Sequence, residues 1–319
     1  MTGQPLYPPA STVSAEFGYY PVPCEIETEK FSVQTMPDHE GIVTAVLGDP
    51  NIFEDWIYPG AQQQLDFMSE KVRLMPYSAR VFGLPKTHVL TLHKSDRQEE
   101  LDFVVWCISF FTGMRLTTTE AGFLDATPIK PGKLVDFLLS RCTLTDAIQV
   151  ALDYLESERS DPRALRRLSA VIHTLFLAQY PQSLTFEQFQ YLYMALDACF
   201  SVIVAKEAKH PKVPHAKRIQ WMCEKFGLPV PEWADCTMTG KTGLSIVRND
   251  AFHEALFFDQ PLGFAIYGGN QPEADRINVT LQMKALICRL LVAILGKPKI
   301  TYVSTPIDTR VRQALELCT

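Results

Sequence analysis

The spacing of apolar residues changes near residue 130 of this 319-residue chain, and this change limits the possible folds more than any other feature. Upstream of it, short β-branched or alternating runs are separated by turn residues, a pattern typical of strands. Downstream, apolar residues recur at helical spacing almost throughout. The sequence therefore predicts an α+β protein with a strand-rich domain over residues 1–130 and a helical domain over residues 131–319.

The first domain is expected to contain short strands and one helix. The helix should start near Ser95 and Asp96, which suit an N-cap, and stop at Gly113. The Pro-containing stretch up to about residue 35 is expected to be irregular or an edge strand. The predicted strands lie at 42–47, 72–75, 80–83, 88–92 and 115–119.

The second domain is expected to be a helical bundle followed by a short strand at 300–303 and a last helix. The helix around residues 189–203 is apolar nearly all round and should be central. Asp161 and Pro162 open the second helix, and Gly227 closes the fourth. The predicted helices lie at 144–155, 165–176, 189–203, 215–226, the segment that contains Arg248 and His253, and 277–295.

Composition and charge favour a cytoplasmic protein. The chain is 47% hydrophobic and 21% charged, and its formal net charge of −6 provides no overall basic field for nucleic acid. Eight cysteines occur singly, which favours reduced core thiols over disulfides. No signal-peptide pattern is found, and the longest apolar run, 285–296, contains Arg289 and is too short to span a membrane. We expect no membrane association, and no His, Cys and Asp spacing predicts a metal site or cofactor.

The residues best suited to chemistry are Arg248, Asn249 and His253, which lie between two long apolar helical patterns. A permanent cation, an amide and an imidazole that titrates near neutral pH could carry out acid–base chemistry on a phosphate ester. A structural role is the alternative. Arg248 and Asn249 could cap a helix and pair with Asp250 or Glu254, and His253 could be an ordinary helix histidine.

Residues 248–253, with the sequence RNDAFH, resemble the R-x4–6-H signature of the HEPN superfamily, in which a polar residue usually follows the arginine. In that family the motif lies in a bundle of four or five helices, and the helices expected from residues 184, 215, 240 and 277 have this order. The matching core covers about 184–298, roughly a third of the chain. Residues 107–115 are similar to part of the strand-rich domain that precedes the bundle in ApeA-type anti-phage HEPN proteins.

The resemblance implies a metal-independent endoribonuclease, in which a 2′-hydroxyl attacks the adjacent phosphate and leaves a cyclic phosphate and a 5′-hydroxyl end. His253 would be the general acid or base, and Arg248 would stabilise the charge that builds on the phosphorane. Asn249 would contact a non-bridging oxygen or orient the imidazole. Five positions along a continuous helix would splay Arg248 from His253, so two copies would complete the site across a two-fold axis. A homodimer is therefore implied.

A basic run at residues 206–218 is the best local candidate for gripping the phosphates of an RNA substrate, although an ordinary solvated loop is the alternative. From it we select Lys212, Lys217 and Arg218 as candidate RNA-binding residues, together with Lys241, just upstream of the motif.

The likeness to anti-phage proteins further implies a role in phage defence or as a toxin. The N-terminal domain would sense a signal or restrain the helical domain. An antitoxin or a phage-derived trigger would be a further partner. The alternative is a HEPN-like module that serves dimerisation or RNA or nucleotide binding and catalyses nothing. The acidic net charge favours this alternative, whereas the intact spacing of Arg248, Asn249 and His253 favours the nuclease.

Overall fold

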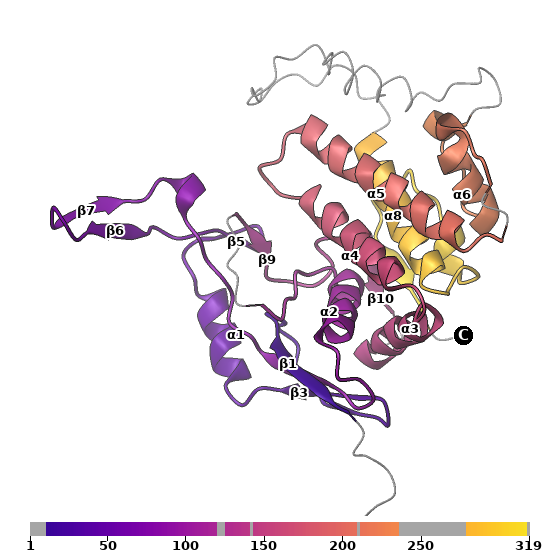
Figure 1. Ribbon diagram of the computed structural model, residues 1–319. Helices are drawn as coiled ribbons and strands as arrows, with labels where there is room; N and C mark the ends of the chain where they lie inside the picture. Colours follow the sequence, from indigo (N-terminus) through magenta and orange to yellow (C-terminus); the bar gives the residue numbers. More distant parts are fainter. Residues whose placement is uncertain (1–10, 120–124, 141–142, 209–210, 236–278, 318–319) are drawn as a thin grey trace, which may run out of the picture. The chain divides into compact units, whose positions relative to one another are not determined.

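The computed structural model describes residues 11–119, 125–140, 143–208, 211–235 and 279–317. The chain divides into two compact units, Met1–Leu134 with Thr143–Leu155 and Val135–Cys142 with Glu156–Thr319 (Figure 1). Both units contain strands as well as helices, so the protein belongs to the mixed α+β class.

A four-stranded antiparallel sheet, in the order β1-β8-β3-β2, lies at the core of the first unit. Burial alternates along its central strand β8, where His88, Leu90 and Leu92 are buried and the residues between them are half-buried. β8 confirms the strand predicted at 88–92. The Pro-containing lead-in supplies the edge strand β1 and also β3, which is paired on both sides. The four strands are Val13–Phe17 (β1), Ile26–Glu27 (β2), Phe31–Thr35 (β3) and His88–Leu92 (β8).

The helix α2 (Gln98–Thr112) packs against β1 and β8 and confirms the predicted helix. Ser95 Oγ accepts a hydrogen bond from the backbone N–H of Arg97 and donates one to Glu100, so this serine organises the first turn. Gly113 ends the helix in the left-handed conformation, at φ 62°, which a residue with a side chain adopts only with strain.

The helix α3 (Leu144–Ser157) has the predicted spacing of buried residues, but most of it clusters with the first unit. The ring of Tyr154 stacks on Phe103 of α2 with centroids 5.7 Å apart. Asp153 also lies 3.7 Å from the ammonium group of Lys30, beside β3. Helical spacing alone could not assign α3 to either part of the chain, because it does not identify the surface that the apolar face covers.

The strand predicted at 42–47 is wrong, because these residues lie in the helix α1 (His39–Leu47). Ile42 and Val46 are four residues apart and share one face of this helix, where Val46 is buried. β-branched side chains lower helix propensity by only a few tenths of a kcal/mol, so burial of this face outweighs them.

Two further predicted strands are also wrong. At residues 80–83, the backbone N–H of Val81 donates to the side chain of Gln62, and Phe82 holds a single bridge position. Residues 115–119 contribute a single bridge, between Thr117 and Gly18. Both runs have the right residue types, but within the described part of the chain neither forms more than one bridge.

The remaining short elements of the first unit are two small antiparallel sheets and a 3₁₀ turn. The strands β4, β5 and β9 form one sheet, and β6 and β7 form a hairpin that confirms the strand predicted at 72–75. Their bounds are Ile52–Phe53 (β4), Trp56–Ile57 (β5), Thr127–Pro128 (β9), Gln63–Asp66 (β6), Lys71–Leu74 (β7) and Tyr77–Ala79 (η1).

Among the described residues of the second unit, four long or medium helices confirm predicted ones. α5 is central and packs against α4, α6 and α8. Asp161 caps α4 by accepting a hydrogen bond from the backbone N–H of Arg163, and Gly227 ends α6 at φ 68°. The helices are Pro162–Leu177 (α4), Thr185–Ala205 (α5), Arg218–Phe226 (α6) and Val279–Ile294 (α8), with 3₁₀ turns at His215–Lys217 (η2) and Glu232–Ala234 (η3).

α5 is long and apolar enough over Phe186–Ala205 to cross a membrane, judged by length and composition only. The apolar run at 285–296, considered in the sequence, lies instead in and just after α8. Packing on three helices gives α5 the surroundings of a core helix, and core helices of proteins without membrane segments pass the same test.

The tail differs from the prediction. Residues 301–304 form a 3₁₀ turn, η5 (Thr301–Ser304), where a strand was predicted. The expected last helix is absent from the described tail, which instead contributes β11 (Gln313–Leu315), parallel to β10 (Phe137–Leu139). β11 depends on a partner strand more than 150 residues away, so local spacing could not reveal it.

Arg289 of α8 is fully buried and all of its donors are used. Its Nη1 donates to Asp136 Oδ2 at 2.7 Å and to the Ala285 carbonyl at 2.8 Å. Its Nε and Nη2 donate to Thr305 and to the Pro306 carbonyl. This network ties α8 to the segments that carry β10 and η5.

The Asp136→Asn substitution is expected to destabilise the second unit by about 3–5 kcal/mol, because it leaves a buried guanidinium without its counter-charge. Asp308→Asn, at an exposed position of the same unit, is the matched control. Calorimetric unfolding of both variants checks this. Equal transitions for Asp136→Asn, Asp308→Asn and the wild type would contradict it.

His88 of β8 is buried among the rings of Phe17, Tyr20 and His39, whose centroids lie between 5.3 and 5.6 Å away. Its Nδ1 hydrogen-bonds Thr87 Oγ1 at 2.9 Å. Burial, reinforced by His39, lowers the pKa of His88 to about 4. The histidine is therefore held neutral within the folded sheet.

Acid should therefore weaken the first unit between pH 6.5 and pH 4. In this window the unfolded chain binds a proton that folded His88 does not, which costs up to about 3 kcal/mol of unfolding free energy by pH 4. Above pH 6.5 His88 is neutral in both states and adds no pH dependence. Unfolding midpoints at pH 7.5, 6 and 5 should fall more steeply for the wild type than for His88→Gln. Parallel pH profiles would refute the assignment.

Candidate functional site

The three motif residues Arg248, Asn249 and His253, and also Lys241, lie outside the described residues. The structure describes the elements that come before and after residues 236–278 in the sequence. On the N-terminal side are α6 and η3, and on the C-terminal side is α8.

The two ends of this segment are held next to each other. The indole Nε1 of Trp233 in η3 donates a 2.7 Å hydrogen bond to Gln282 Oε1 in the first turn of α8. Trp233 is almost completely buried, and α6 packs against α8 beside this bond. This bond therefore joins η3 and α8, the described elements that flank the motif-containing segment in the sequence.

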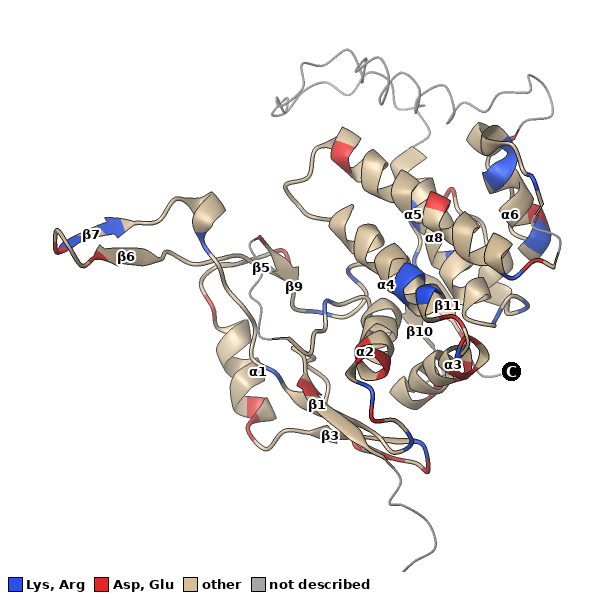
Figure 2. Ribbon diagram, in the orientation of Figure 1, with Lys and Arg blue, Asp and Glu red and all other residues tan. Residues whose placement is uncertain are grey.

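The described part of the basic run extends from Lys206, at the end of α5, to η2 and the first residue of α6. Residues 206–226 hold six lysines and arginines against two glutamates, a local excess of positive charge in a chain of net charge −6. Figure 2 shows basic residues on α6. Lys212 and Lys217 are exposed, and neither forms an ion pair with a described residue. These two lysines are available to phosphates.

Arg218 differs from these lysines because its guanidinium is already engaged. Its Nη1 lies 2.6 Å from Asp197 Oδ1, and its Cζ lies 4.5 Å from the ring centroid of Phe200. Both partners are on α5. Arg218 therefore joins α6 to α5, and its selection as an RNA-binding residue stays a prediction.

A histidine lies next to this ion pair. The ring of His215 stacks on Tyr193 with centroids 5.8 Å apart and an interplanar angle of 19°. Its Nε2 is 3.6 Å from Asp197 Oδ1, so one carboxylate serves both His215 and Arg218. We call Tyr193, Asp197, His215 and Arg218 the α5–α6 cluster. It places a partly exposed imidazole and an aromatic ring beside free lysines, a combination suited to single-stranded nucleic acid.

The sequence indicated only part of this cluster. His215 was noted as a member of the basic run, and Tyr193 was assigned to the apolar stripe of the helix at 189–203. The structure leaves Tyr193 half-buried, at the margin of that stripe. The sequence offers one signal for this cluster. Tyr193 and Asp197 are four positions apart on a helix, so the ring and the carboxylate lie on one face.

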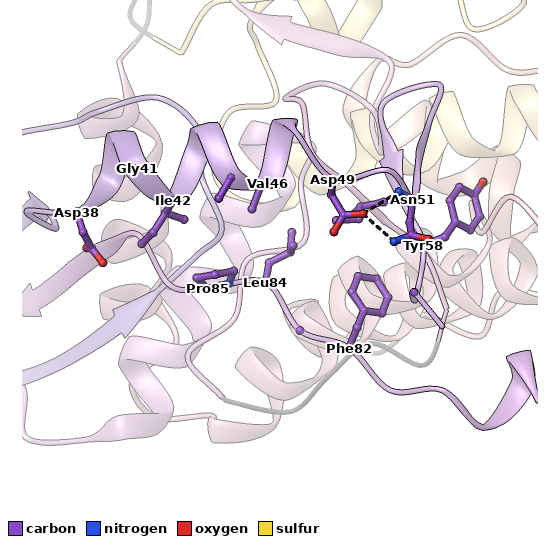
Figure 3. Close-up of a pocket in the computed structure, with 14 residues that line it drawn as sticks. Asp38, Gly41, Ile42, Val46, Asp49, Asn51, Tyr58, Phe82, Leu84 and Pro85 are labelled. Carbon is purple, nitrogen blue, oxygen red and sulfur yellow. Dashed lines mark hydrogen bonds between the residues drawn. The ribbon is translucent and has the colours of Figure 1, made fainter. Parts of the chain in front are cut away.

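The first unit has a pocket of about 550 Å³, lined by α1, by residues 49–60 and by residues 82–85 (Figure 3). Most of its lining is apolar, and Asp38 and Asp49 lie at its two ends. Asp49 Oδ1 accepts hydrogen bonds from the backbone N–H and side-chain amide of Asn51, at 2.7 and 2.8 Å. No Lys, Arg or His is among the described residues that line it.

The described cysteines are free, and four of them are buried, as expected for core thiols. Burial raises the pKa of Cys223 to about 12, so its reactive thiolate is rare at neutral pH. Over the described ranges, no three His, Cys, Asp or Glu side chains are grouped to hold a metal ion.

Comparisons with protein-family models, with curated proteins and with solved structures find no match to this chain. Its function is therefore inferred from its residues and their geometry.

The Arg218→Gln substitution is expected to lower the unfolding free energy of the second unit by about 1–2 kcal/mol, because it removes an ion pair and a cation–π contact between α6 and α5. The neighbouring substitution Lys217→Gln should leave stability nearly unchanged, since this side chain is exposed. Urea unfolding of both variants checks the contrast. Equal effects would show that Arg218 does not anchor α6.

Proposed function

We propose that this chain is a metal-independent endoribonuclease of the HEPN type, which acts in the cytoplasm as a homodimer in phage defence or as a toxin. The observation that carries the proposal is the RNDAFH motif at residues 248–253, in a segment whose two ends meet on a bundle of α5, α6 and α8. The HEPN resemblance implies a motif within a helical bundle, and in the sequence α5 and α6 precede the motif and α8 follows it, in the implied order.

The motif residues supply the groups that RNA cleavage by transesterification needs. A base removes the proton of the 2′-hydroxyl, the 2′-oxygen forms a bond to phosphorus, and the 5′-oxygen leaves with a proton. His253 is the group that titrates in the useful range, Arg248 stabilises the added negative charge, and Asn249 binds a phosphate oxygen or orients the imidazole. The products are a 2′,3′-cyclic phosphate and a 5′-hydroxyl.

The described surface next to the motif segment supports an RNA substrate. Lys212 and Lys217 are exposed and have no described ion-pair partner, so they can neutralise phosphates. His215 and Tyr193 offer ring faces for a base at the margin of α5. Lys241 and Arg218 complete the proposed RNA-binding set, and the ion pair with Asp197 on α5 fixes where Arg218 lies.

The second candidate is a HEPN-like module that binds RNA or nucleotides, or dimerises, without catalysis. The acidic net charge of −6 favours it, because the basic surface is local and small. The two proposals share the RNA surface and differ only in whether Arg248 and His253 turn over substrate.

Cleavage of total RNA and of tRNA in EDTA separates the two candidates. The wild type should leave cyclic-phosphate ends, and His253→Ala or Arg248→Ala should reduce the rate by about 10²–10⁴-fold, because each removes a group that acts in the transition state. Lys225→Gln, which removes a lysine already paired with Glu207, is the control for a general loss of charge.

Equal cleavage by all variants would assign the activity to another site or to a contaminant. Binding of RNA by a folded dimer without any cleavage would favour the non-catalytic module.

A further inference from the structure

The hairpin of β6 and β7 extends away from the sheet and helices of the first unit (Figure 1). We call residues 63–74 the arm. Every residue of its two strands is exposed to solvent. The arm is anchored at its base by Gln62, whose carbonyl accepts from the Met75 N–H and whose side chain accepts from the Val81 N–H.

The arm has one apolar and one polar face. Its register pairs Leu65 with Val72 and Gln63 with Leu74, so Leu65, Val72 and Leu74 share one face. Their exposed fractions are 46%, 60% and 60%. On the opposite face Gln64 pairs with Arg73, which donates to its side-chain oxygen, and Asp66 pairs with Lys71.

The tip of the arm carries two large apolar residues. Phe67 and Met68 are 85% and 96% exposed. Asp66 orders the turn by accepting from the backbone N–H of Met68 at 3.0 Å and from Ser69 Oγ at 2.7 Å. A lone two-stranded hairpin is marginally stable in water, and a contiguous exposed apolar surface of this kind marks an interaction site.

The pocket of the first unit adjoins the base of the arm. Gly60 precedes the arm and Phe82 follows it, and both line the pocket. Ile42 and Leu84 supply apolar walls, and Figure 3 shows them with Phe82 around the opening. The volume of about 550 Å³ lies in the usual range of binding pockets, wide enough for an aromatic and a methionine side chain.

We propose that a second copy of this chain fills the pocket, with the tip of each arm seated at the base of its partner's arm. An arm that starts at the pocket cannot place its tip there, whereas two arms related by a two-fold axis run antiparallel and exchange tips. This arrangement also brings the two apolar faces, Leu65, Val72 and Leu74, against each other. The contact is in the N-terminal unit and goes beyond the proposed function, whose shared site lies in the helical domain.

The charges of the arm balance, because Asp66 and Glu70 carry two negative charges and Lys71 and Arg73 carry two positive ones. The apolar tip therefore supplies the main attraction to the pocket. Lys71 forms no ion pair with a described residue, and Asp38, at one end of the pocket, makes no capping hydrogen bond at the start of α1. A contact between this lysine and the partner's pocket carboxylate would add one complementary charge pair.

A cysteine cross-link tests the exchange directly. Gly41 lines the pocket, and a Cβ built on it meets no atom within 4 Å, so a cysteine fits there. Mixing full-length Gly41→Cys with full-length Met68→Cys under mild oxidation should give a disulfide-linked dimer that neither variant gives alone. Thr44→Cys, exposed on α1 but outside the pocket lining, mixed with Met68→Cys is the matched control.

Sedimentation analysis supplies the second measurement. The double substitution Phe67→Ser with Met68→Ser should raise the dimer dissociation constant by about tenfold or more, because it removes both anchors. Phe53→Ser, at a position 65% exposed in the same unit, should not.

Two outcomes would overturn the exchange. They are a Gly41–Met68 cross-link no stronger than the Thr44 control and an unchanged dissociation constant for the tip variant. Neither readout depends on RNA cleavage, so a failed nuclease assay leaves this test intact, and a failed cross-link leaves the motif chemistry untouched.

Discussion

The buried guanidinium of Arg289 is the contact on which the second unit depends. A charge fully removed from water is tolerated only with a counter-charge and complete hydrogen bonding, so α8 can pack in one way alone. That way brings Asp136, from before the bundle, and Thr305, from after it, to the middle of α8. The parallel pairing of β10 with β11 and the position of η5 follow from the same requirement.

Local signals predicted the elements that depend on local interactions. Asp161 caps α4, Gly113 and Gly227 end their helices in the left-handed conformation, and the apolar stripe of α5 is central, as its spacing indicated. Prediction failed where the deciding partner is distant. The β-branched run at 42–47 is helical, with Val46 buried on its inner face. The tail contributes a strand because β10 offers an edge to pair with.

The candidate site divides in the same way. The motif at 248–253 and the basic run were visible from residue types and spacing, and they remain the basis of the proposed function. Residue types could not show that Arg218 is bound by Asp197 and Phe200 on α5, or that Tyr193 stacks on His215. Those pairings join residues about 20 positions apart, where neither helical spacing nor a short motif carries information.

The hydrogen bond between Trp233 and Gln282 has a consequence for how this protein can evolve. The indole Nε1 can only donate, so a side chain at position 282 that cannot accept would leave the N–H of an almost completely buried tryptophan unsatisfied. Residues 233 and 282 should therefore change together between lineages, although 49 positions separate them in the sequence.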